Sequence, residues 1–211
     1  MLPEPELKAL LTQVPLISVG GPWTRVTAFH LLLGPPPGGT PEAPPQPLWP
    51  GGPILRGARF NPKGSFGSVY LASDPITALE EVDATFESPG SPPITLRTPP
   101  WTVFAVDGLL TNVLDLTDLR MQSRLSTTIA ELTGDWRFSQ TLHLRGEAPL
   151  PPTQRLGRIA FESGRIAALR YHSAKRPGHG FNLVVFADRL AKGASYLEVY
   201  DPNDKIRQRL P

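Results

Sequence analysis

Cysteine is absent from the 211-residue sequence, and its absence removes several chemistries at once. Disulfide bonds, zinc sites built from thiolates and catalysis by a thiol nucleophile are all excluded. The four histidines, His30, His143, His172 and His179, are scattered, with no i, i+4 pair and no carboxylates at metal-ligand spacing. We therefore expect no catalytic metal.

Long hydrophobic runs are also missing, since no stretch approaches the ~20 apolar residues that a membrane helix needs. The first residues, MLPEPELKALL, carry prolines and acids where a signal peptide carries positive charge. These features favour a cytoplasmic protein that does not enter a membrane. The 21 basic and 19 acidic residues give a formal net charge of +2, too weak a field to indicate direct binding to nucleic acid.

Proline, in contrast, is abundant, and its 26 residues predict that much of the chain is loop. Residues 34–53 consist mostly of proline and glycine, which predicts an exposed loop without regular structure. The 40% of hydrophobic residues suffices for one well-filled core, and no shift in composition marks a boundary. Residues 1–211 are therefore expected to form a single domain.

Hydrophobic periodicity predicts short helices mixed with strands. Helical spacing occurs over residues 3–14, 75–86, 125–132 and 153–162, and strand-like patterns occur over residues 23–33, 101–107, 109–119, 165–171, 181–187 and 194–200. A turn at residues 61–64 predicts that the two arms of residues 55–72 pair as a hairpin. No regular βαβ repeat is present, so the fold class is predicted to be α+β.

The helix predicted at residues 75–86 begins with Asp74 as N-cap and Pro75 at its first position. Its spacing predicts one face directed at the core, made of Ile76, Leu79, Val82, Asp83 and Phe86. Glu81 points away from that face, toward a cleft or bulk water. Glu80 turns ~100° away from Glu81 and is expected to be silent when replaced.

Familiar catalytic motifs give little support to other enzyme classes. The string KGSFGSVYLA at residues 63–72 is similar to the glycine-rich loop of protein kinases, but the VAIK-type lysine, HRD-type loop and DFG metal site of a kinase are missing. Neither a G-x-S-x-G elbow nor a G-x-G-x-x-G fingerprint is present, which weakens hydrolase-triad and dinucleotide-binding Rossmann interpretations.

Several strings along the chain together resemble the RES-domain family. GARFNPKG at residues 57–64 resembles its G-x-R-[WF]-N-x-x-G element, and VYLA, DP and ALEEV between residues 69 and 82 resemble its YLA-x-x-P-x-x-A-L-x-E-V run. LDLTD at 114–118 and TQRLG at 153–157 are similar to lesser landmarks, and RYHSAK at 170–175 followed by NLVVF at 182–186 resembles the Y-P-S-x-R…N-L-V-x-F close. The order and spacing of these strings make the resemblance fairly specific.

The resemblance implies an ADP-ribosyltransferase-like split β-sheet core flanked by short helices, with NAD⁺ in a cleft between the two parts. The catalytic residues that it implies are Arg59, Tyr70, Glu81 and Ser173. The residues that it implies for NAD⁺ binding are Arg59, Phe60, Asn61, Tyr70 and Ser173. Glu81 would stabilise positive charge developing on the ribose, and Arg59 would bind the pyrophosphate. Ser173, with Lys175 and Arg176, would bind or attract anionic groups.

Without the resemblance, each of these residues has an ordinary structural explanation. Glu81 would be a solvated helix acid and Arg59 a surface residue. Tyr70 would be a half-buried tyrosine of a sheet, and residues 173–176 would form a solvated basic loop. Both interpretations remain open from the sequence alone.

The function implied by the resemblance is that of an NAD⁺ phosphorylase or glycohydrolase, the toxin of a toxin–antitoxin pair, with NAD⁺ as substrate rather than cofactor. Phosphate, as a co-substrate, or water would accept the ADP-ribose. Two alternatives stay open, a mono-ADP-ribosyltransferase that modifies a protein and a binding module without catalysis. The implied partner is an Xre-type antitoxin with a helix-turn-helix that covers the cleft, within a complex in which the toxin is compatible with a homodimer.

Overall fold

The computed structural model describes residues 1–29, 32, 45–86, 94–95, 100–201, 203 and 206–211. Most of its strands join in one eight-stranded sheet with the order β10-β9-β6-β2-β3-β8-β7, and β1 pairs with β6 beside this path. The strands of this sheet are β1 (Ile17–Gly20), β2 (Trp23–Ala28), β3 (Ser68–Ala72), β6 (Trp101–Asp115), β7 (Ala168–His172), β8 (Phe181–Phe186), β9 (Tyr196–Tyr200) and β10 (Arg207–Leu210). A separate pair consists of β4 (Thr85–Phe86) and β5 (Ile94–Thr95).

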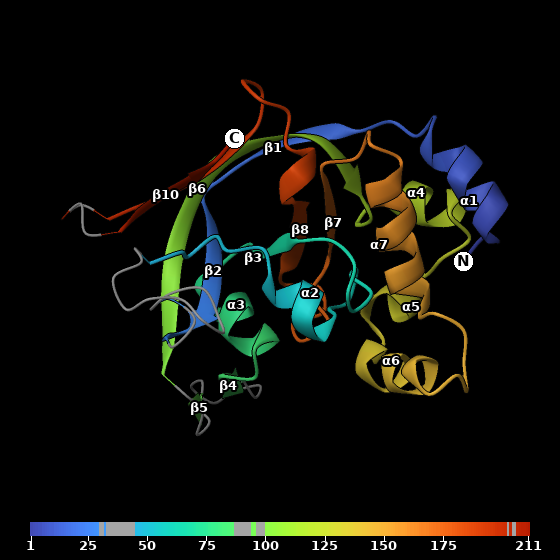
Figure 1. The fold of residues 1–211 in the computed structure, drawn as a ribbon, viewed down its shortest axis with the longest axis horizontal. Coiled ribbons are helices and arrows are strands. Elements are labelled where there is room, and N and C mark those ends of the chain that lie inside the picture. Colours follow the sequence, from blue (N-terminus) through green and yellow to red (C-terminus); the bar gives the residue numbers. More distant parts are fainter. Residues whose placement is uncertain (30–31, 33–44, 87–93, 96–99, 202, 204–205) are drawn as a thin grey trace.

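Short helices flank the sheet, as Figure 1 shows, and most of them gather beyond the end formed by β7 and β8. They are α1 (Glu4–Leu11), α2 (Gly52–Arg56), α3 (Pro75–Glu81), α4 (Leu119–Arg124), α5 (Ile129–Thr133), α6 (Trp136–Leu144) and α7 (Pro152–Glu162), with a 3₁₀ turn at Ala187–Arg189. The α+β class predicted from the sequence is confirmed. None of the helices within the described residues has the length and apolar character needed to cross a membrane.

The sheet is nearly divided between β2 and β3. β2 pairs with β6 over its whole length and β3 pairs with β8 over its whole length, but β2 and β3 meet only where Thr24 lies opposite Ala72. A second connection runs between the end of β6 and β7, which are parallel at Val113–Asp115 and Ala168–Arg170. The split expected from the family resemblance therefore lies between β2 and β3, and it opens a space between the two halves.

Alternation along the strands sends side chains to two hydrophobic clusters, because successive strand residues point to opposite faces of a sheet. Val69 and Leu71 of β3 join a cluster that includes Val106, Leu110 and Leu197. Tyr70 packs instead against a cluster that also holds Tyr171, Val184 and Phe186, together with the buried hydrophobic residues of α1 and α7. The polar side chain of Tyr70 therefore lies on the same face as this second cluster, next to the split between β2 and β3.

The structure confirms the predicted elements at α1, α7, β2, β7, β8 and β9. Strand β2 ends at Ala28. The predictions for residues 30–31 and 33–44 lie outside the described residues, and these undescribed positions make up most of the proline-rich loop. The end of that loop was predicted wrongly, because α2 begins at Gly52. The two strands expected at 101–107 and 109–119 form one continuous strand, β6. The helix expected at 125–132 is confirmed only in its second half, as α5, and α4 precedes it.

The hairpin predicted for residues 55–72 is wrong. Only an isolated bridge between Ala58 and Asn61 forms in its first arm, and β3 pairs with β2 and β8 instead. The buried Asn61 side chain explains this difference, since its Nδ2 donates to the Phe66 carbonyl at 3.1 Å and its Oδ1 accepts from Ser68 Oγ at 2.7 Å. These bonds hold residues 61–68 as a loop rather than as two paired strands.

Helix α3 starts as predicted, with Asp74 accepting a hydrogen bond from the Thr77 backbone, but it ends at Glu81 instead of near Phe86. Asp83 follows with φ 57°, a left-handed conformation that stops a helix. The predicted inward face is also wrong: the buried residues are Thr77, Ala78 and Glu80, and Ile76 is 37% exposed. Because α3 ends at Glu81, the residues Val82, Asp83 and Phe86 cannot extend the predicted inward face along the helix.

Candidate active site

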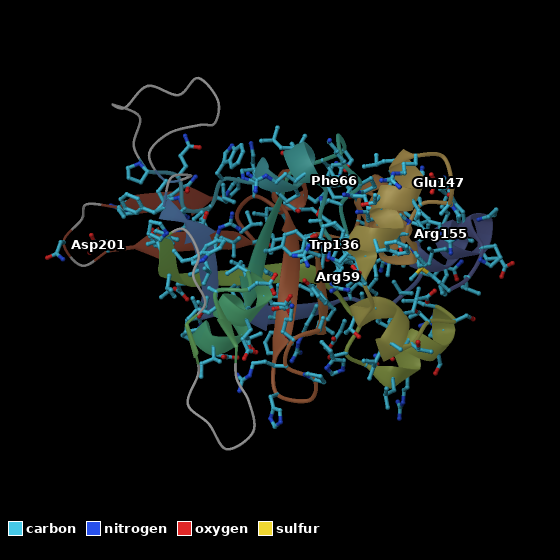
Figure 2. All side chains as sticks on the ribbon, turned by 90° about the horizontal axis from the view of Figure 1, so that it is seen from below. Arg59, Phe66, Trp136, Glu147, Arg155 and Asp201 are labelled. Atoms are coloured by element: carbon cyan, nitrogen blue, oxygen red, sulfur yellow. The ribbon has the colours of Figure 1, made fainter. Side chains whose placement is uncertain are left out.

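A pocket lies where the sheet is split, bounded by both of its halves and by α3 and α6. It is lined by Thr24, Val26, Ala58, Arg59, Tyr70, Leu71, Ala72, Ala78, Glu81, Val82, Trp136, Arg137, Tyr171 and Asn182. Figure 2 shows Arg59 and Trp136 close together near the middle of the molecule. Three of the residues expected from the sequence, Arg59, Tyr70 and Glu81, thus line one pocket.

Glu81, at the end of α3, is the carboxylate of this pocket, and one of its oxygens is held firmly. Its Oε1 accepts from Ser173 Oγ at 2.7 Å and from Asn182 Nδ2 at 2.8 Å. Ser173 is 1% exposed and Asn182 3% exposed, so water competes little for either donor. Among the described residues no hydrogen bond to Oε2 is formed. One oxygen is therefore fixed by the protein and the other remains available to a ligand in the pocket.

Ser173 does not line the pocket but lies behind Glu81, in the loop between β7 and β8. Its backbone N–H donates to the Gly180 carbonyl at 3.0 Å, and its Oγ accepts from the backbone N–H groups of Lys175 and Arg176 at 3.2 and 3.1 Å. The hydroxyl proton is thereby directed to Glu81. Ser173 is a positioning residue for the carboxylate in this structure, and the predicted contact with NAD⁺ stays a prediction.

Arg59 occupies the tight turn closed by the Ala58–Asn61 bridge, and its side chain is 9% exposed. Its Nη1 donates to the Leu132 carbonyl at 2.9 Å and to the Gly134 carbonyl at 2.8 Å. These acceptors belong to the end of α5 and the segment before α6. Both acceptors are uncharged, so these bonds place no counter-charge beside the guanidinium at the wall of the pocket.

Tyr70 connects the pocket to a buried polar network. Its hydroxyl donates to Asn61 Oδ1 at 2.8 Å and accepts from the Phe60 N–H at 3.0 Å. Burial raises the pKa of Tyr70 above its ordinary value, more than its hydrogen bonds and the charge of Arg59 lower it. The hydroxyl therefore stays protonated and acts as a donor at neutral pH.

Phe60 and Asn61 do not line the pocket, and their expected contact with NAD⁺ stays a prediction. Both side chains are fully buried. The Phe60 ring packs edge-on against Tyr171, with 4.7 Å between ring centroids, and Asn61 bonds to the protein interior. Their positions instead indicate that they shape the turn that carries Arg59 and hold the Tyr70 hydroxyl.

Eleven of the fourteen pocket residues were not among the site residues predicted from the sequence, and four of these carry an aromatic, amide or guanidinium group: Asn182, Tyr171, Trp136 and Arg137. Asn182 and Tyr171 stand inside strings that carry the RES resemblance, so a signal for them existed. Burial chiefly, and then the charge of Glu81, raises the pKa of Tyr171, which keeps its phenol neutral. Trp136 and Arg137 begin a helix without buried residues, so no hydrophobic pattern pointed to them.

Lys175 and Arg176, expected to attract an anionic substrate, are occupied by acidic neighbours. Lys175 Nζ lies 2.6 Å from Asp83 Oδ1, and Arg176 lies 3.3 Å from Asp74 and 3.7 Å from Glu80. That expectation is therefore not supported, because the ion pairs offset much of the positive charge. Glu80 takes part in these contacts, since it is 6% exposed and fastens α3 to the loop at Arg176, while the expected silence of its replacement stays a prediction.

Asp74 connects the start of α3 to the same loop. Burial alone would raise the pKa of Asp74, but hydrogen bonds from Thr77 and Ser73 and the charge of Arg176 outweigh it and lower the pKa below its usual value. Gly180 lies so close to Thr77 that an added Cβ would overlap the threonine side chain. Helix α3 and the loop after β7 therefore form one unit, and Glu81 is held between them.

Within the described residues, no three acidic or histidine side chains come together to hold a metal ion. The carboxylate at the pocket is instead accompanied by two arginines and two tyrosines. This set suits an organic substrate with anionic groups and a carbon centre that becomes positive.

Comparisons with known proteins agree with this geometry. The structure is similar to a chain in the crystal structure of the M. tuberculosis MbcT–MbcA toxin–antitoxin complex, with a TM-score of 0.61 and 17% sequence identity over 93% of this chain and 90% of that chain. At this identity the similarity shows the fold alone. No curated protein matches the sequence. The model of the RES domain matches residues 39–206, and the chain therefore belongs to the RES-domain family.

Proposed function

We propose that this chain is an NAD⁺-degrading enzyme that cleaves the bond between nicotinamide and ribose. The observation that carries the proposal is the carboxylate of Glu81, held through Oε1 by Ser173 and Asn182 at the wall of a pocket lined by cations. Membership of the RES-domain family supports the choice of substrate. NAD⁺ serves as substrate, and no bound cofactor is required.

In the proposed reaction the bond between ribose C1′ and the nicotinamide nitrogen breaks, and its electron pair leaves with nicotinamide. C1′ then carries positive charge shared with the ring oxygen, as in glycoside hydrolysis. A preorganised carboxylate stabilises that charge without having to reorient, which is the reason for fixing Oε1 of Glu81. An oxygen of phosphate or water then bonds to C1′, and water loses its proton to the solvent.

The acceptor is open to direct test. Purified protein would be incubated with NAD⁺ labelled in its adenylate phosphate, with and without inorganic phosphate, and the products separated by liquid chromatography. Phosphorolysis gives a phosphorylated ADP-ribose at a rate that rises with phosphate concentration, whereas hydrolysis gives plain ADP-ribose. Label transferred to protein would instead establish the alternative of a mono-ADP-ribosyltransferase, and absence of any turnover would leave a non-catalytic binding module.

We further propose that the chain is the toxin of a toxin–antitoxin pair. The support comes from the RES family and from the similar fold found in the MbcT–MbcA toxin–antitoxin complex. The partner proposed is an Xre-type antitoxin with a helix-turn-helix, which would bind over the pocket and supply the DNA binding, with a homodimer of the toxin inside the complex. Co-expression with an antitoxin of the Xre type that binds this chain should suppress NAD⁺ turnover; unchanged turnover in a stable complex would contradict inhibition by coverage of the pocket.

A further inference from the structure

The helix α6 contributes a second cation to the pocket, Arg137, whose surroundings differ from those of Arg59. Its side chain lines the pocket yet is exposed to solvent, and its guanidinium carbon lies 5.3 Å from the centre of the Trp136 ring. Asp135, the nearest acid in sequence, accepts from the backbone N–H groups of Arg137 and Phe138. No carboxylate of the described residues forms an ion pair with Arg137, so its donors remain available.

Arg59, by comparison, is committed to the protein. Its Nη1 is used by the carbonyls of Leu132 and Gly134, which lead directly into α6. A guanidinium bound in this way fixes the segment that begins at Asp135 and carries Trp136 and Arg137 to the pocket. Arg59 therefore helps to hold the pocket wall through one of its nitrogens, and at 9% exposure it offers a ligand little surface.

A second fastening holds α6 farther along the helix. Gln140 Nε2 donates to the Arg56 carbonyl at 3.1 Å, and Gln140 Oε1 accepts from Gln154 Nε2 at 2.6 Å. These bonds matter because α6 has no buried residue and so gains little from hydrophobic packing. Polar contacts, Arg59 among them, set where its first turn lies.

We propose that Arg137 is the residue that binds the pyrophosphate of the dinucleotide, with Trp136 orienting its guanidinium and Arg59 positioning both. This assignment rests on the proposed function. Arginine presents a planar fork of donors that matches two phosphate oxygens, and a guanidinium over an aromatic ring is restrained before the ligand arrives. Arg137 would thus bind the anionic part of NAD⁺ while Glu81 faces the nicotinamide ribose.

Equilibrium binding tests this assignment without relying on turnover. ADP-ribose, which carries the pyrophosphate, and nicotinamide riboside, which carries no phosphate, would be titrated into the unaltered protein and into Arg137→Ala, followed by calorimetry. Loss of hydrogen bonds to a charged group should weaken ADP-ribose binding by about 10- to 100-fold. Affinity for nicotinamide riboside should stay the same. Arg137→Lys should fall between the two, because it keeps the charge and loses the fork.

Arg145→Ala is the matched control, since Arg145 is an exposed arginine at the other end of α6 that does not line the pocket. It should bind ADP-ribose as the unaltered protein does. Equal ADP-ribose affinity in Arg137→Ala and Arg145→Ala would overturn the assignment while leaving the proposed function intact. Failure of the unaltered protein to bind either compound would contradict the proposed function itself, and this inference with it.

Discussion

Replacing Ser173 by alanine removes the hydroxyl that fixes Glu81 and therefore tests how the carboxylate is held. Ser173 Oγ is nearly inaccessible to water and donates to Glu81 Oε1 at 2.7 Å. A hydrogen bond to a charged group contributes about 1.5–3 kcal/mol. If the carboxylate must be preorganised for the transition state, losing that bond should lower kcat by about 10- to 100-fold. Asn182 still holds Oε1, so activity should not vanish.

The assay is steady-state release of nicotinamide from NAD⁺, with kcat and KM measured separately. A positioning role predicts a fall in kcat with little change in KM, whereas direct contact between Ser173 and bound NAD⁺ would raise KM. Because the two residues act as a unit, adding Glu81→Gln to Ser173→Ala should cost much less than Glu81→Gln costs alone. Full kcat in a folded Ser173→Ala protein would refute the reasoning.

The same alanine also leaves the backbone N–H groups of Lys175 and Arg176 without their acceptor, so some loss of stability is expected as well. Urea denaturation should show a loss of about 1–3 kcal/mol. Circular dichroism at the assay temperature then separates unfolding from a true change in kcat. Thr at position 173 retains the hydroxyl and should recover part of the lost kcat.

Three further changes test the parts that carry the site. Gly157→Ala should destabilise the fold by about 1–3 kcal/mol in urea denaturation, because the added Cβ would overlap the Phe60 carbonyl beside Arg59; an unchanged midpoint would contradict this packing. Tyr70→Phe should lower the free energy of unfolding by about 1–3 kcal/mol, because it leaves the Phe60 N–H unpaired. A smaller loss in thermal or urea unfolding would count against the hydrogen-bond network around the Tyr70 hydroxyl. Asp74→Ala should cost about 0.5–2 kcal/mol at pH 7 as a lost N-cap. The pKa of Asp74 is lowered in the folded protein, so its charged form stabilises the fold above the ordinary pKa of 3.8. The difference in free energy of unfolding between the unaltered protein and Asp74→Ala should therefore shrink as the pH falls below 3.8. A difference that does not depend on pH would refute this reasoning.

The elements that the sequence predicted well are those whose signal is local. The N-cap at Asp74 needs only the next few residues, and α7 has a continuous apolar face, so both were read correctly. The hairpin failed because its outcome depends on Asn61, whose buried bonds reach Phe66 and Ser68. A turn signal in sequence does not reveal which strand the following segment will pair with.

The candidate site shows the same limit. Glu81 and Ser173 were found through their place in family-like strings, and the structure brings them into direct contact across the fold. Arg137 and Trp136 were missed because α6 contributes no buried residue to the core and neither residue stands in a string that carries the family resemblance. Its place beside the pocket depends on long-range bonds from Arg59 and Gln140, which no local pattern encodes.

Nicotinamide release by the unaltered protein and by Glu81→Gln is the most direct test of the central claim. Glu147→Gln is the matched control, since Glu147 is exposed and Figure 2 shows it well away from Arg59 and Trp136. Removal of a charge that stabilises the transition state should lower kcat by about 10²–10³-fold in Glu81→Gln, while Glu147→Gln retains the activity of the unaltered protein. Equal rates for Glu81→Gln and Glu147→Gln, or no nicotinamide from any of the three proteins, would contradict the assignment of this pocket to NAD⁺ cleavage.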